Sequence, residues 1–363
     1  MGVWEYGSES SSPTLLHPHT LYFFPHSPQT VMDELKVALL GLGNVGLAFS
    51  DYLARASDDI ARRIRICGVA DSSGGLISRD QRRINQAIEQ KATGRSIRDF
   101  APDDAMSETD FVRRLKDFGV SVLVESLPTN LTDGQPALDL ICAALIRGIN
   151  VVTVDKGPLA YGFDTLKQAA REGRAQIAFT GTTGVRPPDG ITSERVMEIR
   201  GVLNGTTNYI LTEMQERGIS FDDALAEAQR SGIAEPDPRL DIGGWDTAVK
   251  ILILAKQLMG ARCSLAEVSR IGIGKETESL IESARARGCV IRLIGRARIW
   301  QGRVRVSVAP KMIDPASLFY SVRGTSKAAV FRTEKGELTG VGLSGRDQIA
   351  EVILEDITRL VQA

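Results

Sequence analysis

The chain has 363 residues, of which 43% are hydrophobic, and a formal net charge of −1. This length allows two domains with a sizeable core, and the near-neutral charge offers no broad electrostatic attraction to nucleic acid or to an anionic membrane surface. No apolar run approaches the roughly 18 residues of a transmembrane helix. We therefore expect no nucleic-acid or membrane partner. The cysteines are widely spaced and form no metal pattern, which favours a reduced, cytoplasmic location.

The beginning of the chain differs from the rest. Residues 1–34 are rich in Ser, Pro and His and lack the basic start and long apolar core of a signal peptide. We predict a poorly ordered extension here, with Met32 as an alternative start of translation. All the histidines of the chain lie in this segment, at His17, His19 and His26. Proton transfers elsewhere must therefore use Lys, Asp, Glu, Tyr or water, and no metal site is predicted.

A GxGxxG segment follows an apolar strand predicted at residues 36–40 and precedes a helical pattern. An ordinary glycine turn is the simpler interpretation, but this order is that of a dinucleotide-binding loop. Its glycines permit a tight turn and close approach to a pyrophosphate, and the helix N-terminus attracts the phosphate charge. A second strand at 64–70 ends at a carboxylate that can bind the adenosine ribose. The predicted cofactor contacts are Gly41, Gly43, Asn44, Val45, Gly46 and Asp71.

The sequence leaves the choice between NAD and NADP open. Asp71 favours NAD, whereas Ser72, Ser73 and Arg79 could accommodate the 2′-phosphate of NADP. Residues 72–119 are predicted to be a charged insertion with helical stretches.

Two further strands, at 120–125 and 151–154, are predicted in the same sheet, with a helix near 136–147 between them. In a doubly wound sheet, the loops at the carboxyl ends of the strands line the ligand crevice. Ser126 and Thr129 follow the first of these strands and are predicted cofactor contacts. Lys156 follows the second, so it is both a cofactor contact and a catalytic candidate, although a lysine after a strand is more commonly a surface residue.

The second half of the chain contains an Asn-Gly-Thr-Thr turn at 204–207 that opens a helix ending at Gly218. Free N–H groups at such a helix start can bind a carboxylate, and Gly205 and Thr206 are the candidates; simple helix capping is the alternative. A further short helix is predicted between Ser220 and Gly232. Strand-like alternation over residues 289–309 is typical of a sheet that packs a dimer together.

The stretch from Glu235 to Lys250 is the most informative of the chain. Two prolines hold its first part extended, and an apolar helix follows Gly243-Gly244. Within this helix, Asp246 and Lys250 are four residues apart and share a face. Burial of an ion pair for stability alone is unfavourable, so a site with a tuned lysine is the better explanation. A partly exposed surface pair is the alternative.

In this order, the motifs at 41–46, 151–158, 204–210 and 235–250 resemble those of the homoserine dehydrogenases. The resemblance runs from about residue 35 to the C-terminus. It implies an α/β protein with a Rossmann-type, doubly wound NAD(P)-binding domain at 35–157, completed by 330–363. It also implies an α+β substrate-binding and dimerisation domain at 158–329, and a homodimer. A terminal helix at 348–361 is expected to pack back on the nucleotide domain.

The resemblance further implies the activity and the site. Homoserine dehydrogenases reduce L-aspartate 4-semialdehyde to L-homoserine with NADPH or NADH, in the pathway to threonine, methionine and isoleucine. The resemblance implies hydride-transfer chemistry at Lys156 and Lys250. Lys250, oriented by Asp246, is the expected proton donor to the aldehyde oxygen. The implied substrate pocket contains Gly205, Thr206, Glu235, Asp241 and Asp246, with Glu235 as the candidate for the substrate ammonium.

The chain departs from the family pattern at three places. Thr180 stands where many members carry a glutamate that helps to bind a monovalent cation, so no metal is predicted. The glycine-rich block at 340–345, which includes the cofactor candidate Gly342, is followed by an imperfect match. No regulatory domain of the ACT type is expected after residue 363. Two other functions stay open: a related NAD(P)-dependent dehydrogenase of another amino-alcohol or semialdehyde, and a catalytically silent nucleotide-binding protein.

Overall fold

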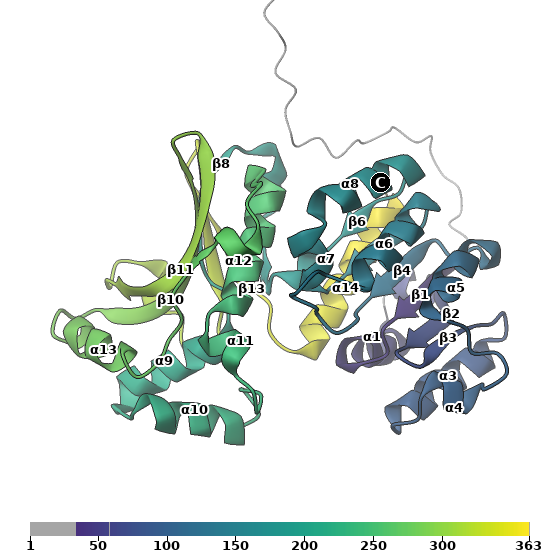
Figure 1. The fold of residues 1–363 in the computed structure, drawn as a ribbon, viewed down its shortest axis with the longest axis horizontal. Coiled ribbons are helices and arrows are strands. Elements are labelled where there is room, and N and C mark those ends of the chain that lie inside the picture. The colour runs from purple at the N-terminus through teal and green to yellow at the C-terminus, as the bar shows by residue number, and fades with distance from the viewer. Residues whose placement is uncertain (1–33, 58, 363) are drawn as a thin grey trace, which may run out of the picture.

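The computed structural model describes residues 34–57 and 59–362, which form two lobes, each built around one sheet (Figure 1). The predicted N-terminal extension, with its three histidines and Met32, lies outside the described residues apart from Glu34. In the part of the chain that is described, no helix is long and apolar enough to cross a membrane.

The first lobe contains a six-stranded sheet in the order β3-β2-β1-β4-β5-β6. Its inner strands are buried runs rich in Val, Leu and Ile, as expected for a parallel sheet covered on both faces. All pairs are parallel except β2–β3, which is an antiparallel hairpin. This is the predicted doubly wound sheet. Its strands are β1 (Leu35–Leu40), β2 (Ile64–Asp71), β3 (Gly74–Ile77), β4 (Val122–Glu125), β5 (Asn150–Thr153) and β6 (Ile177–Ala178).

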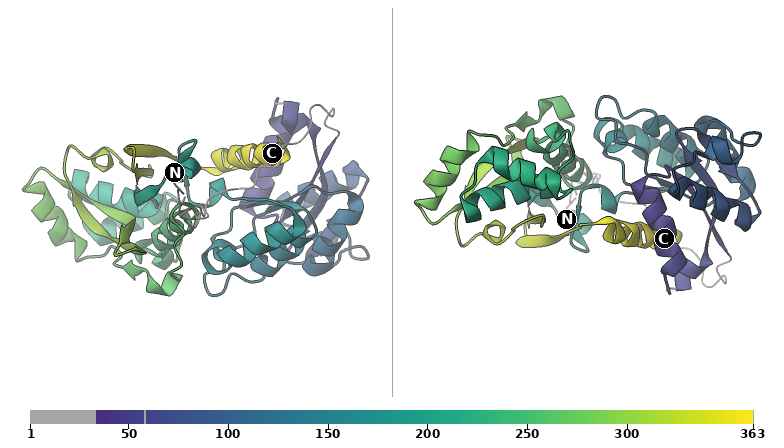
Figure 2. Two further views of the ribbon diagram at one scale, coloured as in Figure 1. Left: turned by 90° about the horizontal axis from the view of Figure 1, so that it is seen from above. Right: turned by 90° about the horizontal axis from the view of Figure 1, so that it is seen from below.

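Helices cover both faces of this sheet. The predicted terminal helix is α14 (Arg346–Gln362), which packs against α1 and returns the chain to the first lobe (Figure 2). The charged segment 72–119 is helical as predicted, but it also contributes the short strand β3. The remaining helices are α1 (Asn44–Arg55), α2 (Asp59–Arg63), α3 (Gln81–Ala92), α4 (Ile97–Phe100), α5 (Glu108–Arg114), η1 (Leu115–Phe118), α6 (Ala137–Ile146), α7 (Lys156–Tyr161) and α8 (Phe163–Gly173).

The second lobe contains a seven-stranded sheet in the order β7-β13-β12-β8-β10-β11-β9. The predicted strands near 289–309 form its longest hairpin, β10–β11. Its strands are β7 (Val185–Arg186), β8 (Val196–Val202), β9 (Ser269–Arg270), β10 (Val290–Trp300), β11 (Arg303–Ile313), β12 (Ala328–Thr333) and β13 (Glu337–Gly342).

The helix α12 (Trp245–Met259) packs on this sheet against β8, β10 and β11. The other helices of this part are η2 (Thr180–Thr182), η3 (Ile191–Ser193), α9 (Gly205–Arg217), α10 (Phe221–Arg230), α11 (Arg239–Ile242), η4 (Leu265–Glu267), α13 (Thr277–Arg285) and η5 (Leu318–Tyr320).

The two sheets divide the chain differently from the predicted domain boundaries. The first sheet continues past residue 157, because α7, α8 and β6 form another crossover unit of the same sheet. Residues 330–342 belong to the second sheet, and only α14 returns to the nucleotide-binding lobe. A strand of two residues such as β6 carries almost no periodic signal, which explains the difference.

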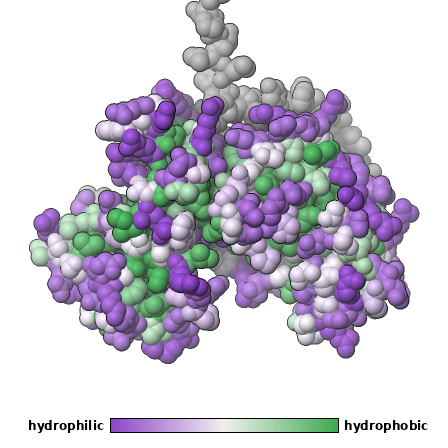
Figure 3. All heavy atoms as spheres, viewed as in Figure 1, coloured by the Kyte–Doolittle hydropathy of each residue, from purple (hydrophilic) through white to green (hydrophobic). Residues whose placement is uncertain are grey.

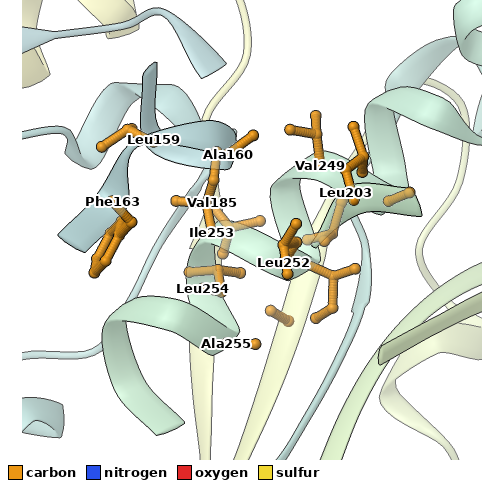
Figure 4. Close-up of a cluster of buried hydrophobic side chains, with 14 of the residues drawn as sticks. Leu159, Ala160, Phe163, Val185, Leu203, Val249, Leu252, Ile253, Leu254 and Ala255 are labelled. Carbon is orange, nitrogen blue, oxygen red and sulfur yellow. The ribbon is translucent and has the colours of Figure 1, made fainter. Parts of the chain in front are cut away.

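An apolar cluster joins the two lobes beside the site. Figure 4 shows Leu159 and Ala160 of α7 facing Ile253 and Leu254 of α12, with Val185 between them. Each of these side chains is at most 3% exposed, so the contact is a dry core and not a loose domain interface. Because the cluster fixes α7 against α12, it also fixes the residues at the N-terminal ends of both helices.

Candidate active site

The three glycines of the loop after β1 have two different structural roles. A Cβ on Gly41, whose φ is +105°, would meet the Ser126 carbonyl at 2.6 Å, and a Cβ on Gly46 would meet the Gly41 carbonyl oxygen at 2.1 Å. These two glycines allow the backbone to pack tightly. Gly43 is the N-cap of α1, and a Cβ there would have no neighbour within 4 Å. The open space at the start of α1 fits the pyrophosphate of a dinucleotide.

The predicted contacts Asn44 and Val45 form the first turn of α1, behind this opening. Ser126 lies at the switch between β1 and β4, where its hydroxyl donates to the Gly41 carbonyl at 2.9 Å. The side chain of Thr129 lies near the carboxylate of Asp155. The structure therefore brings the loops after β1, β4 and β5 together at one edge of the sheet.

The carboxylate of Asp71 lies at the same edge but is held by the protein itself. It accepts hydrogen bonds from the Ser73 amide and hydroxyl, from Lys91 at 2.7 Å and from the Ile97 amide at 3.2 Å. Burial opposes its ionisation, but these hydrogen bonds outweigh burial and lower the pKa of Asp71. Its acceptor positions are filled, so ribose binding requires one of these partners to move.

The expectation that Arg79 meets a 2′-phosphate is wrong. The β2–β3 hairpin reverses the chain and carries Arg79 back to the opposite edge of the sheet, where its guanidinium lies over Phe118. The cations beside the exposed Ser72 are instead Lys91 and Arg98, whose guanidinium donates to the Ser73 carbonyl at 3.0 Å. Neither cation was predicted, because they lie 20 and 27 residues beyond Asp71 in two short helices whose positions depend on tertiary packing.

Asp246 and Lys250 form the predicted pair on α12, and the pair is largely buried. Lys250 Nζ lies 2.6 Å from Asp246, with side-chain exposures of 12% and 15%. The ammonium also donates to the Leu203 carbonyl at 3.0 Å. Lys156, from the other lobe, brings its Nζ to 3.8 Å from the same carboxylate. The two lysines predicted from separate motifs therefore converge on one aspartate.

Asp246 is ionised in this cluster. Burial raises its pKa, but the ammonium groups of Lys250 and Lys156 and the hydrogen bonds from Asn204 and Lys250 prevail and lower it to about 2. Asn204 was not predicted as a site residue; its amide nitrogen donates to both Asp246 at 2.9 Å and Asp241 at 2.6 Å. Burial and the charge of Asp246 raise the pKa of Asp241.

The predicted helix start supplies free donors next to this cluster. The Asn204 side chain accepts from the Thr207 amide at 2.8 Å, which leaves the amides of Gly205 and Thr206 without an acceptor inside α9. Asp241, at α11, faces them through Asn204. Glu235, by contrast, is exposed in the preceding loop, and among the described residues its carboxylate makes no hydrogen bond or ion pair with the cluster.

Gly342 has a packing role that the sequence did not indicate. A Cβ at this position would lie 2.2 Å from the backbone oxygen of Lys327, so only glycine lets the two strands pass. Lys327 itself was missed. Its ammonium lies beside that of Lys250 near Gly184, and burial together with Lys250 lowers the pKa of Lys327 to about 8.

The carboxylate next to Thr180 belongs to Asp356 and is held by other groups of the protein. The amide and hydroxyl of Thr180 donate to Asp356 of α14, at 2.9 and 2.7 Å, and Arg359 adds an ion pair at 2.9 Å. These partners occupy the acidic group that lies next to Thr180. Within the described residues, no group of three or more His, Cys, Asp or Glu could hold a metal ion.

A buried carboxyl group ends β4 beside the cofactor edge. Glu125 is fully buried and accepts from the Leu127 amide at 2.7 Å and the Thr153 hydroxyl at 2.5 Å. Burial, with the nearby charge of Asp155, raises the pKa of Glu125 from 4.5 to about 8. Glu125 therefore keeps its proton at neutral pH.

This protonation makes the effect of Glu125→Gln on stability depend on pH. Between about pH 4.5 and 8 the unfolded chain releases the proton that the folded chain keeps, so this group lowers stability as pH rises. Glutamine has no such loss. We expect the free energy of unfolding of the variant, relative to wild type, to increase by at least about 1 kcal/mol from pH 5 to pH 8. Urea unfolding at both pH values measures it, and a difference that stays constant would show that Glu125 is ionised.

The first lobe has the loop of a dinucleotide-binding protein, and two lysines share one buried aspartate where the lobes meet. This combination is that of an NAD(P)-dependent oxidoreductase. Sequence profiles agree: residues 41–180 match the homoserine dehydrogenase NAD-binding domain, and residues 188–358 match homoserine dehydrogenase. The chain belongs to the homoserine dehydrogenase family, enzymes of amino-acid biosynthesis.

Individual relatives match over nearly the whole chain. A homoserine dehydrogenase of Methanocaldococcus jannaschii is 32% identical, covering 90% of this chain and 98% of the relative. An NAD(+)-dependent homoserine dehydrogenase of Pseudomonas canavaninivorans is 30% identical, covering 92% and 97%. The crystal structure of a homoserine dehydrogenase from Thiobacillus denitrificans superposes with a TM-score of 0.74 at 29% identity, covering 90% of this chain and 73% of that one.

Proposed function

We propose that the chain interconverts L-homoserine and L-aspartate 4-semialdehyde at the cluster of Lys156, Lys250 and Asp246. The observation that carries the proposal is the convergence of two lysines, one from each lobe, on one buried carboxylate. A structural ion pair needs only one of them. Two ammonium groups around one aspartate leave positive charge to meet an oxygen that becomes negative.

A reduced nicotinamide cofactor, when bound at the loop after β1, would supply the hydride that the aldehyde carbon receives. Lys250 stabilises the negative charge that develops on the aldehyde oxygen and donates a proton to it, while Asp246 and the Leu203 carbonyl orient the ammonium. Lys156 assists from the cofactor side. The amides of Gly205 and Thr206 bind the carboxylate of the substrate.

The substrate ammonium needs an anionic partner. Asp241 is hydrogen-bonded to Asn204, the residue that precedes Gly205 and Thr206, and is therefore placed for this role. We expect Glu235, which lies in an exposed loop, to move toward the bound ligand and to contribute as well. These assignments apply equally to the reverse reaction, in which Lys250, once deprotonated, accepts the proton of the homoserine hydroxyl.

The activity is tested by following the oxidation of NADH and NADPH with L-aspartate 4-semialdehyde, and the reduction of NAD and NADP with L-homoserine. Turnover of L-homoserine at a higher kcat/KM than that of related amino-alcohols supports the proposal. Preference for another amino-alcohol would identify a related dehydrogenase, and cofactor binding without any turnover would identify a silent nucleotide-binding protein.

The cofactor preference depends on Lys91. We expect Lys91→Met to remove a cation from the 2′-phosphate site and to free one acceptor position on the Asp71 oxygen that it shares with the Ile97 amide, for the ribose of NAD. Both effects lower the NADP-to-NAD ratio of kcat/KM, by about 10–100-fold for the loss of one charge-assisted contact. Arg79→Met is the matched control at the opposite edge of the sheet. A ratio that responds to Arg79 and not to Lys91 would contradict this assignment.

A homodimer in the cytoplasm is part of the proposal. The β10–β11 hairpin and its neighbours support it, because Met312, Leu318 and Trp300 are 38–44% exposed there. Figure 3 shows apolar side chains reaching the surface of this lobe. Sedimentation equilibrium of the wild type and of Met312→Asp tests it: the variant should shift toward the monomer, and a monomeric wild type would refute it.

A further inference from the structure

Lys327, just before β12, has no role in the mechanism proposed above. Its Nζ and that of Lys250 each lie 3.5 Å from the place that a Cβ on Gly184 would take. The two nitrogens therefore cannot be further apart than twice this distance. Lys250 has Asp246 and the Leu203 carbonyl as partners, whereas no hydrogen bond or ion pair joins the Lys327 ammonium to another residue that the structure describes.

The backbone holds Lys327 firmly in this position. The side-chain amide of Asn208, on α9, donates to the carbonyls of Val322, Gly324 and Ser326 at 3.3, 2.9 and 3.2 Å, which ties the loop before Lys327 to α9. On the other side, the Lys327 backbone passes directly over Gly342. These contacts fix the backbone from which the half-buried Lys327 side chain extends.

The same loop reaches the start of α9. The backbone oxygen of Thr325 lies 2.9 Å from the place of a Cβ on Gly205, so Lys327 follows two residues after a close contact with the residue that begins α9. An ammonium without a partner and the N–H groups at the start of α9 each favour the binding of an anion. The nearby carboxylates of Asp246 and Asp241 are already engaged by Lys250, Lys156 and Asn204.

The substrate has one anionic group at the required place. Homoserine and aspartate semialdehyde carry the α-carboxylate at the opposite end of a four-carbon chain from the reacting oxygen. The two Nζ atoms are close enough for one substrate molecule to reach both. If its hydroxyl oxygen meets Lys250, its α-carboxylate can therefore meet Lys327. We propose that Lys327 binds the α-carboxylate of the substrate, together with the amides of Gly205 and Thr206, and so selects α-amino acids over amino-alcohols that lack the carboxylate. This inference rests on the proposed function.

The test compares L-homoserine with 3-aminopropan-1-ol, which differs only in lacking the carboxylate. We expect Lys327→Met to lower kcat/KM for L-homoserine by about 10–100-fold, mainly through KM, because it loses a charge-assisted contact. The kcat/KM for 3-aminopropan-1-ol should stay within about two-fold of wild type, and Lys327→Arg should restore part of the selectivity. L-2-Aminobutyrate, which has no hydroxyl to oxidise, provides a reading that is independent of hydride transfer, and its Ki should rise by a similar factor.

Lys335→Met is the matched control. Lys335 follows the same strand but is 79% exposed and paired with Glu194, so its loss should leave both substrates unaffected. An equal loss of activity on both substrates in Lys327→Met, with the Ki of L-2-aminobutyrate unchanged, would overturn the proposal and place Lys327 at the reacting oxygen. An unchanged selectivity would also overturn it. Failure of the wild type to oxidise L-homoserine would instead refute the proposed function, so the two failures are distinguishable.

Discussion

Replacing Lys250 by methionine is expected to lower kcat for homoserine oxidation by about 10²–10⁴-fold while the fold is retained. Methionine keeps the apolar stem that packs in α12 and removes the ammonium that meets the reacting oxygen. Asp246 loses its partner at 2.6 Å, but Lys156 still compensates its charge and Asn204 still donates a hydrogen bond to it. Steady-state kinetics measure the effect, and circular dichroism with thermal unfolding checks the fold.

Lys256→Met is the control for this experiment. Lys256 lies on the same helix, and burial lowers its pKa, so its loss should not reduce stability or kcat. A Lys250→Met enzyme within a few-fold of the wild-type kcat would exclude Lys250 as the proton donor. A variant that unfolds would instead show that the pair with Asp246 is mainly structural, and Lys250→Arg would then serve as the folded test.

Gly46→Ala is expected to lower the stability of the protein, whereas Gly43→Ala is expected to lower its affinity for the cofactor. A Cβ on Gly46 meets a backbone oxygen at 2.1 Å, which the loop cannot avoid, so Gly46→Ala should lose about 3 kcal/mol or more of stability even without cofactor. A Cβ on Gly43 meets no protein atom within 4 Å. Gly43→Ala should therefore unfold like the wild type.

The effect of Gly43→Ala should appear only in the binding of the dinucleotide. The new methyl group enters the opening at the start of α1 and holds the pyrophosphate away from the amides, so the Kd for NAD(P) should rise about 10–100-fold. Fluorescence titration with NADH or NADPH measures this Kd. Wild-type cofactor affinity in a stable Gly43→Ala protein would show that the pyrophosphate does not bind there.

The features set by local sequence were predictable. The strand–glycine–helix order predicts the nucleotide loop, and the i,i+4 spacing of Asp246 and Lys250 predicts a shared helix face whatever the surroundings. The position of Lys156 in the ligand crevice was predictable as well, because loops at the carboxyl ends of parallel strands meet at one edge of the sheet.

Features that depend on tertiary packing were not predictable. Arg79 follows Asp71 closely in sequence, but the antiparallel strand β3 carries it to the far edge, while Lys91 returns on a helix to meet Asp71. Lys327 stands in a loop without periodicity, and its position becomes clear only when α9 and β13 are packed around it. The exposed position of Glu235 likewise depends on how its loop folds.

The central claim is that Lys156 and Lys250, one from each lobe, both reach the substrate oxygen that is protonated when the aldehyde is reduced and deprotonated when the alcohol is oxidised. The direct measurement is a crystal structure of the enzyme with reduced cofactor and L-homoserine, a pair that cannot react. It should place Nζ of both Lys156 and Lys250 about 2.6–3.2 Å from the homoserine hydroxyl, directly or through one water. Either ammonium turned into bulk solvent, more than about 10 Å from that hydroxyl, would contradict the claim.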